Sequence, residues 1–282
     1  MLGTELALLL EKSKLPHVGT DREIDITNRD ALFSFADNFS KIDWIINCAA
    51  YTAVDKAEDD RETCRLLNTD GAGNIAATAC KTGATLVHIS TDYVFNGKKT
   101  MPYTEEDLTD PIGIYGLTKR DGEIRTLEEN PKSYIIRTAW LYGKYGNNFV
   151  HTMLRLMNER DEIKAVDDQR GSPTWTYDLA SAVMAIIKGA GSGNGIPFGI
   201  YHFANEGDIS WFDFAKEIFK LGKEQGRITK DCVVKPCTSD EYPSKVKRPS
   251  YSVLDKGKIK ATLGIEIPQW EKSLSKMISG ET

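Results

Sequence analysis

Residues 85–95 read Thr-Leu-Val-His-Ile-Ser-Thr-Asp-Tyr-Val-Phe. The first five residues are mostly apolar, which is typical of a strand buried on both faces of a parallel sheet. Two hydroxyl side chains, Ser90 and Thr91, follow where this strand should end. Ligands of doubly wound sheets bind beyond the carboxyl ends of the strands. The stretch therefore predicts both a parallel sheet and the place of a binding site.

Strand and helix patterns alternate outward from this stretch, as they do in an α/β sheet. Further strands are predicted at residues 17–20, 44–49, 134–136, 163–166, 200–204 and 232–235. One helix is predicted at residues 6–10 and a second directly after Asn28, which can cap it. A long helical stretch is predicted from about residue 54 to residue 82, with a break near Asn68 and with Gly83 as its C-cap. Further helices are predicted at residues 115–127, 148–158, 178–188, 212–223 and 269–277. The fold class is thus α/β, with a Rossmann-like doubly wound parallel sheet.

The second half of the chain has a looser pattern, which predicts a smaller mixed α/β domain. We expect the first domain to cover residues 1–145 and the second to cover 146–282, with residues of about 175–205 returning to the first. Residues 189–195 hold four glycines and predict a surface loop, and residues 96–111 predict a polar loop.

Composition excludes several classes of protein. The 282 residues carry 36 Lys plus Arg against 41 Asp plus Glu, a net charge of −5, which argues against a nucleic-acid binder. No apolar run reaches membrane length, and no signal peptide pattern starts the chain. The five cysteines and four histidines show no metal-ligand or disulfide spacing, so we expect no metal site and a reducing cytoplasm.

Tyr115 and Lys119 lie four positions apart on a predicted helix and therefore on one helix face. An ammonium beside a phenol lowers the tyrosine pKa, which makes Tyr115 a candidate general acid. Such a pair is also common on a solvated helix face. The small residues Ala49 and Ala50 end one predicted strand and Trp140 follows another, where plain packing is the competing interpretation.

The order of these features resembles the short-chain dehydrogenase/reductase superfamily, and more closely the dTDP-4-dehydrorhamnose reductase family within it. The resemblance covers essentially the whole chain. Its motifs are residues 25–27 (Asp-Ile-Thr), 47–58 (Asn-Cys-Ala-Ala-Tyr-Thr-Ala-Val-Asp-Lys-Ala-Glu), 90–95 (Ser-Thr-Asp-Tyr-Val-Phe), 115–119 (Tyr-Gly-Leu-Thr-Lys), 137–140 (Arg-Thr-Ala-Trp), 168–174 (Asp-Gln-Arg-Gly-Ser-Pro-Thr) and 248–249 (Arg-Pro).

The resemblance implies reduction of the 4-keto group of dTDP-4-dehydro-L-rhamnose, with Thr91, Tyr115 and Lys119 as the catalytic residues. Tyr115 would protonate the keto oxygen, Lys119 would lower the pKa of Tyr115 and hold the nicotinamide ribose, and Thr91 would bind the developing alkoxide. The substrate contacts it implies are Asp92, Tyr93, Trp140 and Arg248.

The same resemblance implies NADPH as cofactor, with NADH as the other nicotinamide to test. The residues it places at the cofactor are Gly3, Asp21, Arg22, Asp25, Ile26, Ala49, Ala50, Tyr51, Tyr115 and Lys119. Arg22 would meet the 2′-phosphate. Some relatives dimerise through magnesium bridged by glutamates, so a homodimer is a candidate state, although no magnesium site is assigned to residues here.

The start of the chain departs from the family pattern Gly-x-x-Gly-x-x-Gly, of which only the third glycine, Gly3, is present. The strand before this turn would sit centrally in the sheet, and its loss would expose the edges of two neighbours. We expect Met1 to be an internal methionine of the glycine turn, since the catalytic positions are intact. A chain that truly lacks the strand and binds cofactor weakly is the competing interpretation, and the codons upstream of Met1 decide between them.

Two other functions share these motifs. One is a non-catalytic regulatory subunit of the type found with methionine adenosyltransferase, which would use NADP as a structural ligand. The other is a nucleotide-sugar epimerase or dehydratase, and a dehydratase would use an acidic residue beside Thr91, where Asp92 stands.

Overall fold

The computed structural model describes residues 1–190 and 195–281. The positions 191–194 in the middle of the predicted loop at 189–195 lie outside the described residues, and that prediction is not tested there. No helix in the described ranges is both long and apolar enough to span a membrane.

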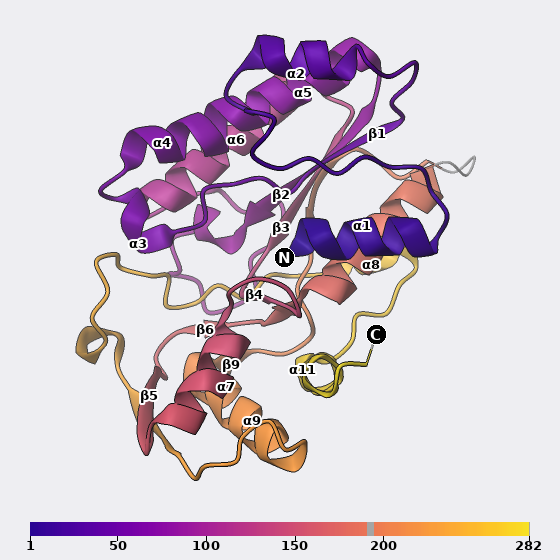
Figure 1. Ribbon diagram of the computed structural model, residues 1–282. Coiled ribbons are helices and arrows are strands. Elements are labelled where there is room, and N and C mark those ends of the chain that lie inside the picture. The colour runs from indigo at the N-terminus through magenta and orange to yellow at the C-terminus, as the bar shows by residue number, and fades with distance from the viewer. Residues whose placement is uncertain (191–194, 282) are drawn as a thin grey trace.

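The main sheet has four parallel strands in the order β1-β2-β3-β8 (Figure 1). These strands are β1 (Trp44–Asn47), β2 (Thr85–Thr91), β3 (Ser133–Thr138) and β8 (Gly199–His202). Helices cover both of its faces, which confirms the predicted Rossmann-like α/β class. They are α1 (Leu2–Lys12), α2 (Arg29–Ala36), α3 (Val54–Ala57), α4 (Arg61–Arg65), the π-helical turn η1 (Leu66–Asp70), α5 (Gly71–Thr82), α6 (Ile114–Glu129) and α8 (Thr176–Ala190).

Each face of the sheet has its own core. Leu86 of β2 packs with residues of α2 and α5, among them Leu32 and Ile75. Val87, the next residue, points to the other face and packs with α1 and α8. This alternation follows from the period of two in a strand, and it explains why the run at residues 85–89 is apolar on both sides.

Two glycines let α6 approach its neighbours closely. A Cβ on Gly116 would lie 2.1 Å from the backbone oxygen of Tyr93, and one on Gly122 would lie 2.1 Å from that of Asn68. Both distances are shorter than any real contact allows, so only glycine fits. The site-bearing helix is thus fixed against both the turn after β2 and the π-helical turn.

The predicted strand at residues 17–20 is wrong. These residues form no strand and all four are exposed. A strand needs a partner to satisfy its N–H and C=O groups, and within the described chain no strand lies beside this segment. For the same reason β1 pairs only with β2 among the described strands, and its first three residues are just partly buried.

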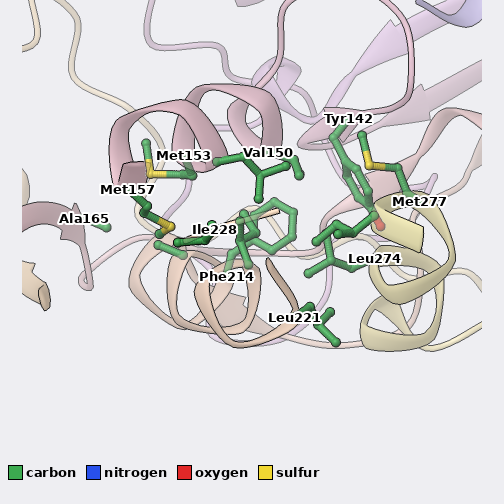
Figure 2. Close-up of a cluster of buried hydrophobic side chains, with 14 of the residues drawn as sticks. Tyr142, Val150, Met153, Met157, Ala165, Phe214, Leu221, Ile228, Leu274 and Met277 are labelled. Carbon is green, nitrogen blue, oxygen red and sulfur yellow. The ribbon is translucent and has the colours of Figure 1, made fainter. Parts of the chain in front are cut away.

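The second half of the chain carries shorter elements around a third core. They are β4 (Leu141–Tyr142), α7 (Phe149–Glu159), β5 (Glu162–Val166), β6 (Arg170–Gly171), β7 (Thr174–Trp175), β9 (Ile209–Ser210), α9 (Trp211–Glu224), β10 (Val233–Cys237) and α11 (Trp270–Ser279), with the 3-10 turn η3 (Ser239–Glu241). α10 (Gly257–Leu263) lies in the same half but packs on the core of the main sheet. A further 3-10 turn, η2 (Asp92–Val94), directly follows β2. Phe214 of α9 lies at the centre of this core, between Val150 of α7 and Leu274 of α11 (Figure 2).

The chain returns from this region to the main sheet. β8 pairs with β3 in parallel, from Tyr134↔Gly199 to Arg137↔His202. α8 packs on α1 across the face of the sheet (Figure 1). The division into two domains near residue 145 stays a prediction.

Candidate active site

Thr91, Tyr115 and Lys119 come together at the carboxyl end of β2. Thr91 is the last residue of that strand, and α6, which carries the other two, packs against both β2 and the turn η2. Tyr115 forms a side-chain hydrogen bond with Thr91. The Thr91 hydroxyl donates to Oδ1 of Asp92 at 3.0 Å and accepts from the Tyr93 amide at 3.2 Å. The threonine is therefore held in one orientation, with its oxygen available to the phenol.

The sequence predicts a lowered pKa for Tyr115, and the net shift in this structure is in the opposite direction. Burial raises the pKa of Tyr115, and the hydrogen bond with Thr91 only opposes that shift. Lys119 is almost fully buried, and its Nζ donates to the Ile89 carbonyl at 2.6 Å. Burial lowers the pKa of Lys119 to about 8. A neutral phenol is the form that can donate a proton, so Tyr115 remains suited to act as an acid.

Asp92 is a buried carboxyl group beside the threonine. Burial raises the pKa of Asp92 to about 6, against the lowering effect of hydrogen bonds from Ser252 and Thr91. Its Oδ2 has no hydrogen-bond partner within the described part of the chain. A buried oxygen without a partner is costly, so it is placed to receive a hydrogen bond from a ligand.

Arg248 lies near Tyr93 and has an acidic partner that the sequence did not suggest. Its Nη2 is 3.1 Å from Oδ2 of Asp55, and Ser244 donates to the other oxygen of that carboxylate at 3.0 Å. Burial raises the pKa of Tyr93, and the nearby Arg248 charge opposes that shift. The buried Nε of Arg248 has no partner among the described residues. The guanidinium therefore has spare donors beside Tyr93.

Trp140 has a backbone conformation that is unusual for a residue with a side chain, with φ at 47°. Its ring stacks on Trp211 with centroids 3.6 Å apart and planes 10° from parallel. Backbone strain of this kind is concentrated at functional sites. The stack connects this indole, which packs against the buried cluster that includes Phe95 and Ala139, to Trp211 of the third core.

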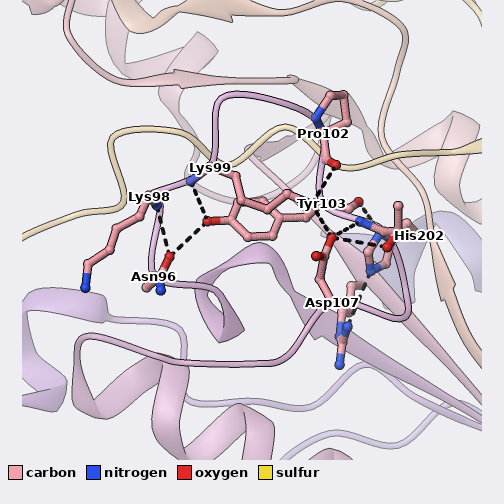
Figure 3. A network of polar contacts seen from close by, with 9 residues as sticks. Asn96, Lys98, Lys99, Pro102, Tyr103, Asp107 and His202 are labelled. Carbon is pink, nitrogen blue, oxygen red and sulfur yellow. Dashed lines mark hydrogen bonds and ion pairs between the residues drawn. The ribbon is translucent and has the colours of Figure 1, made fainter.

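The loop after η2 is fastened to the end of β8, on the same side of the sheet as Thr91. The Tyr103 carbonyl contacts Nδ1 of His202 at 3.1 Å, and Lys99 pairs with Asp107 at 2.6 Å (Figure 3). Burial lowers the pKa of His202 to about 3, helped by the Arg137 charge. The neutral ring can therefore donate from Nδ1, and the polar loop predicted at residues 96–111 is a fixed segment.

The residues expected at the cofactor fall into three groups. Ala49, Ala50 and Tyr51 follow β1, where the Asn68 side chain accepts from the Tyr51 amide at 2.8 Å and donates to its carbonyl at 3.1 Å. Gly3 lies beside the same strand end, since a Cβ on it would be 3.8 Å from that of Cys48.

The second group, Asp25 and Ile26, packs against α5. Ile26 contacts Gly71, and its carbonyl accepts from Asn74 at 3.1 Å. Asp21 and Arg22 form the third group, in an exposed turn away from the triad. Within the described ranges Arg22 has no ion pair.

The sequence assigned no role to two further buried residues, Asn47 and His88. Both residues are less than 5% exposed, His88 contacts Nζ of Lys119 at 3.4 Å, and Asn47 contacts His88 at 3.0 Å. A histidine inside an otherwise apolar strand is the signal that could have pointed to it. In the described parts of the chain, no cluster of three or more His, Cys, Asp or Glu could hold a metal ion, and all five cysteines are free thiols.

A parallel doubly wound sheet with a Thr, Tyr and Lys group at its carboxyl edge defines the class of short-chain dehydrogenases/reductases. The model of the RmlD substrate binding domain matches residues 1–282, the full length of the chain. The chain therefore belongs to this family, that of the dTDP-4-dehydrorhamnose reductases, and it is an oxidoreductase.

Individual relatives agree with this assignment. A dTDP-4-dehydrorhamnose reductase from Aggregatibacter actinomycetemcomitans is 42% identical over 97% of this chain and 93% of its own length. The crystal structure of one from Clostridium acetobutylicum has a TM-score of 0.91 at 43% identity, covering 98% of this chain and 94% of that one. One from Bacillus anthracis in complex with NADP has a TM-score of 0.90 at 38% identity, covering 98% and 94%.

Proposed function

We propose that this protein reduces the 4-keto group of dTDP-4-dehydro-L-rhamnose, with NADPH as the hydride source. The observation that carries the proposal is the Tyr115 phenol, hydrogen-bonded to Thr91 at the carboxyl edge of the sheet with Lys119 one turn away. The family membership supports the substrate, and the NADP complex of a relative supports the cofactor.

The residues present fit a phosphorylated dinucleotide in three respects. No side chain caps the start of α1, so its first amides stay available beside Cys48 for a pyrophosphate. Ala49 and Ala50 leave room for a close approach to the backbone. The unpaired guanidinium of Arg22 suits a 2′-phosphate. When bound, NADPH supplies the hydride.

The remaining chemistry belongs to the side chains of this protein. Tyr115 donates its phenolic proton to the keto oxygen, because its raised pKa keeps it protonated until the oxygen gains charge. Thr91 donates to the same oxygen when its hydroxyl hydrogen turns from Asp92 to the substrate, while the Tyr93 amide continues to hold the threonine oxygen in place. Lys119 stabilises the tyrosinate that forms. Asp92, Tyr93 and Trp140 contact the sugar, and Arg248 exchanges Asp55 for the diphosphate of the substrate.

Tyr115→Phe tests the proposal. The substitution removes only the phenolic hydroxyl, and we expect NADPH oxidation with the keto-sugar nucleotide to fall by about 10²- to 10⁴-fold. Tyr134→Phe is the matched control, because this buried tyrosine donates to the Ile196 carbonyl instead and stands outside the site. A wild-type protein that binds NADP but never consumes NADPH would overturn the proposal and support the regulatory role.

The buried, readily protonated Asp92 beside Thr91 also suits a dehydratase, which needs an acid at that place. A dehydratase or an epimerase recycles its nicotinamide, whereas a reductase consumes one NADPH for each sugar. The stoichiometry of NADPH loss against product formed separates the two. Substoichiometric loss with turnover of the sugar would favour the dehydratase or the epimerase.

A further inference from the structure

His88 is a buried ring in contact with Lys119 that the proposed chemistry does not use. It sits on β2 with 1% of its surface exposed. Its Nε2 is 3.4 Å from Nζ of Lys119, and its Nδ1 is 3.0 Å from Nδ2 of Asn47, the residue directly opposite on β1. Burial lowers the pKa of His88 far below its usual range, and the Lys119 charge acts in the same direction. The ring is therefore neutral and carries a single proton.

Asn47 decides which nitrogen holds that proton. Its Oδ1 accepts from the Ala49 amide at 3.0 Å, so its NH₂ group faces His88 and can only donate. Nδ1 of the ring must then accept, which leaves the proton on Nε2. With the proton on Nδ1 instead, the ring and the Asn47 NH₂ group would be two donors 3.0 Å apart. Rotating the Asn47 amide by half a turn would set its NH₂ group against the Ala49 N–H, which is also a donor.

The Nε2–H group points at the nitrogen of Lys119. A neutral amine can accept this hydrogen, whereas an ammonium has only donors and is repelled. We propose that His88, oriented by Asn47, is a positioning residue that holds the Lys119 amine and disfavours its charged form. The inference rests on the proposed function only where it concerns the rate of reduction.

Other groups around Lys119 act on the same equilibrium. Burial favours the neutral amine, while Glu123 on α6, Cys48 after β1 and Cys64 on α4 favour the ammonium. Glu123 is itself engaged, because both its oxygens accept from the buried Arg137. The balance places the pKa of Lys119 at about 8. Lys119 therefore changes charge close to working pH, and with it the charge beside Tyr115.

The tautomer of His88 is measured directly in the wild-type protein by ¹⁵N NMR of labelled histidine, with its signals assigned by their loss in His88→Leu. We expect Nε2 to carry the proton and the ring to stay neutral from pH 5 to 9. A proton on Nδ1, or a ring that titrates in this range, would overturn the inference. This measurement needs no turnover and no variant that must keep its activity.

Four proteins then test the coupling to Lys119: wild type, Asn47→Asp, His88→Leu and the double variant. An aspartate at position 47 can accept from Nδ1, which moves the ring proton there and leaves Nε2 to accept from an ammonium. We expect ¹³C NMR of labelled lysine to show the pKa of Lys119 raised by about one unit or more in Asn47→Asp. With leucine at position 88, the Asn47→Asp substitution should raise the pKa of Lys119 by less than half as much.

Equal shifts in both backgrounds would mean that the new carboxylate acts through space, and would overturn the role of the ring. In the reductase assay, the alkaline limb of the pH profile of kcat/KM should move to higher pH in Asn47→Asp. The move should equal the rise in the Lys119 pKa, because loss of the Lys119 ammonium ends turnover. If the wild-type protein proves inactive, the proposed function fails while both NMR outcomes still decide the role of His88.

Discussion

Substitutions at the two members of the Arg248–Asp55 ion pair should change the KM for the sugar nucleotide in opposite directions. Arg248→Gln removes the guanidinium, and we expect the KM for the sugar nucleotide to rise about 10- to 100-fold, the value of a hydrogen bond to a charged group. Asp55→Asn removes the competitor of the diphosphate, so the KM should fall. Steady-state kinetics with saturating NADPH measure both.

Lys245→Gln is the control for this pair. Lys245 pairs with Asp59 at 2.6 Å, and both side chains are more than 60% exposed, so its loss should change the KM little. If Asp55→Asn raised the KM as much as Arg248→Gln, the pair would be a structural unit rather than a contact that the substrate exchanges.

Asp92 gives the stability of the protein a defined dependence on pH. Its folded pKa of about 6 lies above the usual 3.8 of an unfolded aspartate, so the folded state binds the proton more tightly between these values. Its contribution to the free energy of unfolding is therefore most favourable at low pH and is lost as pH rises to 6, by about 3 kcal/mol at most.

Urea unfolding of wild type and Asp92→Asn from pH 4 to pH 7 measures this contribution. We expect the difference between the two proteins to change in that interval and to be constant above it. A constant difference throughout would show that the Asp92 carboxyl keeps an ordinary pKa.

At the scale of elements, α6 depends on its close contact with the π-helical turn. Gly122→Ala puts a Cβ against the backbone of Asn68, and we expect a loss of about 2–3 kcal/mol in the free energy of unfolding. Gly73→Ala is the matched control, because Gly73 is also a buried helical glycine but has only ordinary contacts, at 3.4 Å with Arg125. That variant should gain about 0.5–1 kcal/mol. Equal losses in urea unfolding would contradict the packing argument.

The sequence predicts the buried strands well because their character is local. Residues 85–91 and 133–138 are buried or partly buried on both faces, and the apolar runs inside them are visible in the sequence. Residues 17–20 look similar, but a strand also requires a neighbour, which no local pattern records. The break predicted near Asn68 is confirmed by the π-helical turn, but the form of that turn is hidden from the sequence, since Asn68 is held by the backbone of Tyr51, which lies 17 positions away in the chain.

The site is predictable in the same partial way. The spacing of Tyr115 and Lys119 on one helix is visible in the sequence, and so is the hydroxyl of Thr91. The partner of Arg248 is not, because Asp55 is almost 200 positions away and its carboxylate resembles any other surface acid. The direction of the Tyr115 pKa also depends on burial, which only the packed structure decides.

At the scale of the whole molecule, several connections join the third core to the main sheet. Asn205 follows β8 and donates to Asp178 of α8 at 2.7 Å and to Ser273 of α11 at 3.1 Å. Because this buried network crosses from one region to the other, we expect both to unfold in one transition.

Phe214→Ala tests that expectation from the centre of the third core, at a cost of about 3–5 kcal/mol. Of the five tryptophans, only Trp44 packs with the core of the main sheet, so fluorescence reports mainly on the other region. Circular dichroism reports on all helices. Both transitions should shift to lower urea together, whereas separate midpoints would show independent domains.

The stacked pair of Trp140 and Trp211 has an optical consequence. Two indoles in parallel contact couple their electronic transitions, so the pair should give a strong signed doublet in the circular dichroism spectrum that isolated tryptophans lack. One member is a proposed sugar contact, and the other begins α9. Arrival of the sugar nucleotide should therefore change the doublet before any chemistry occurs. The protein carries a built-in chromophore for following substrate binding without a label.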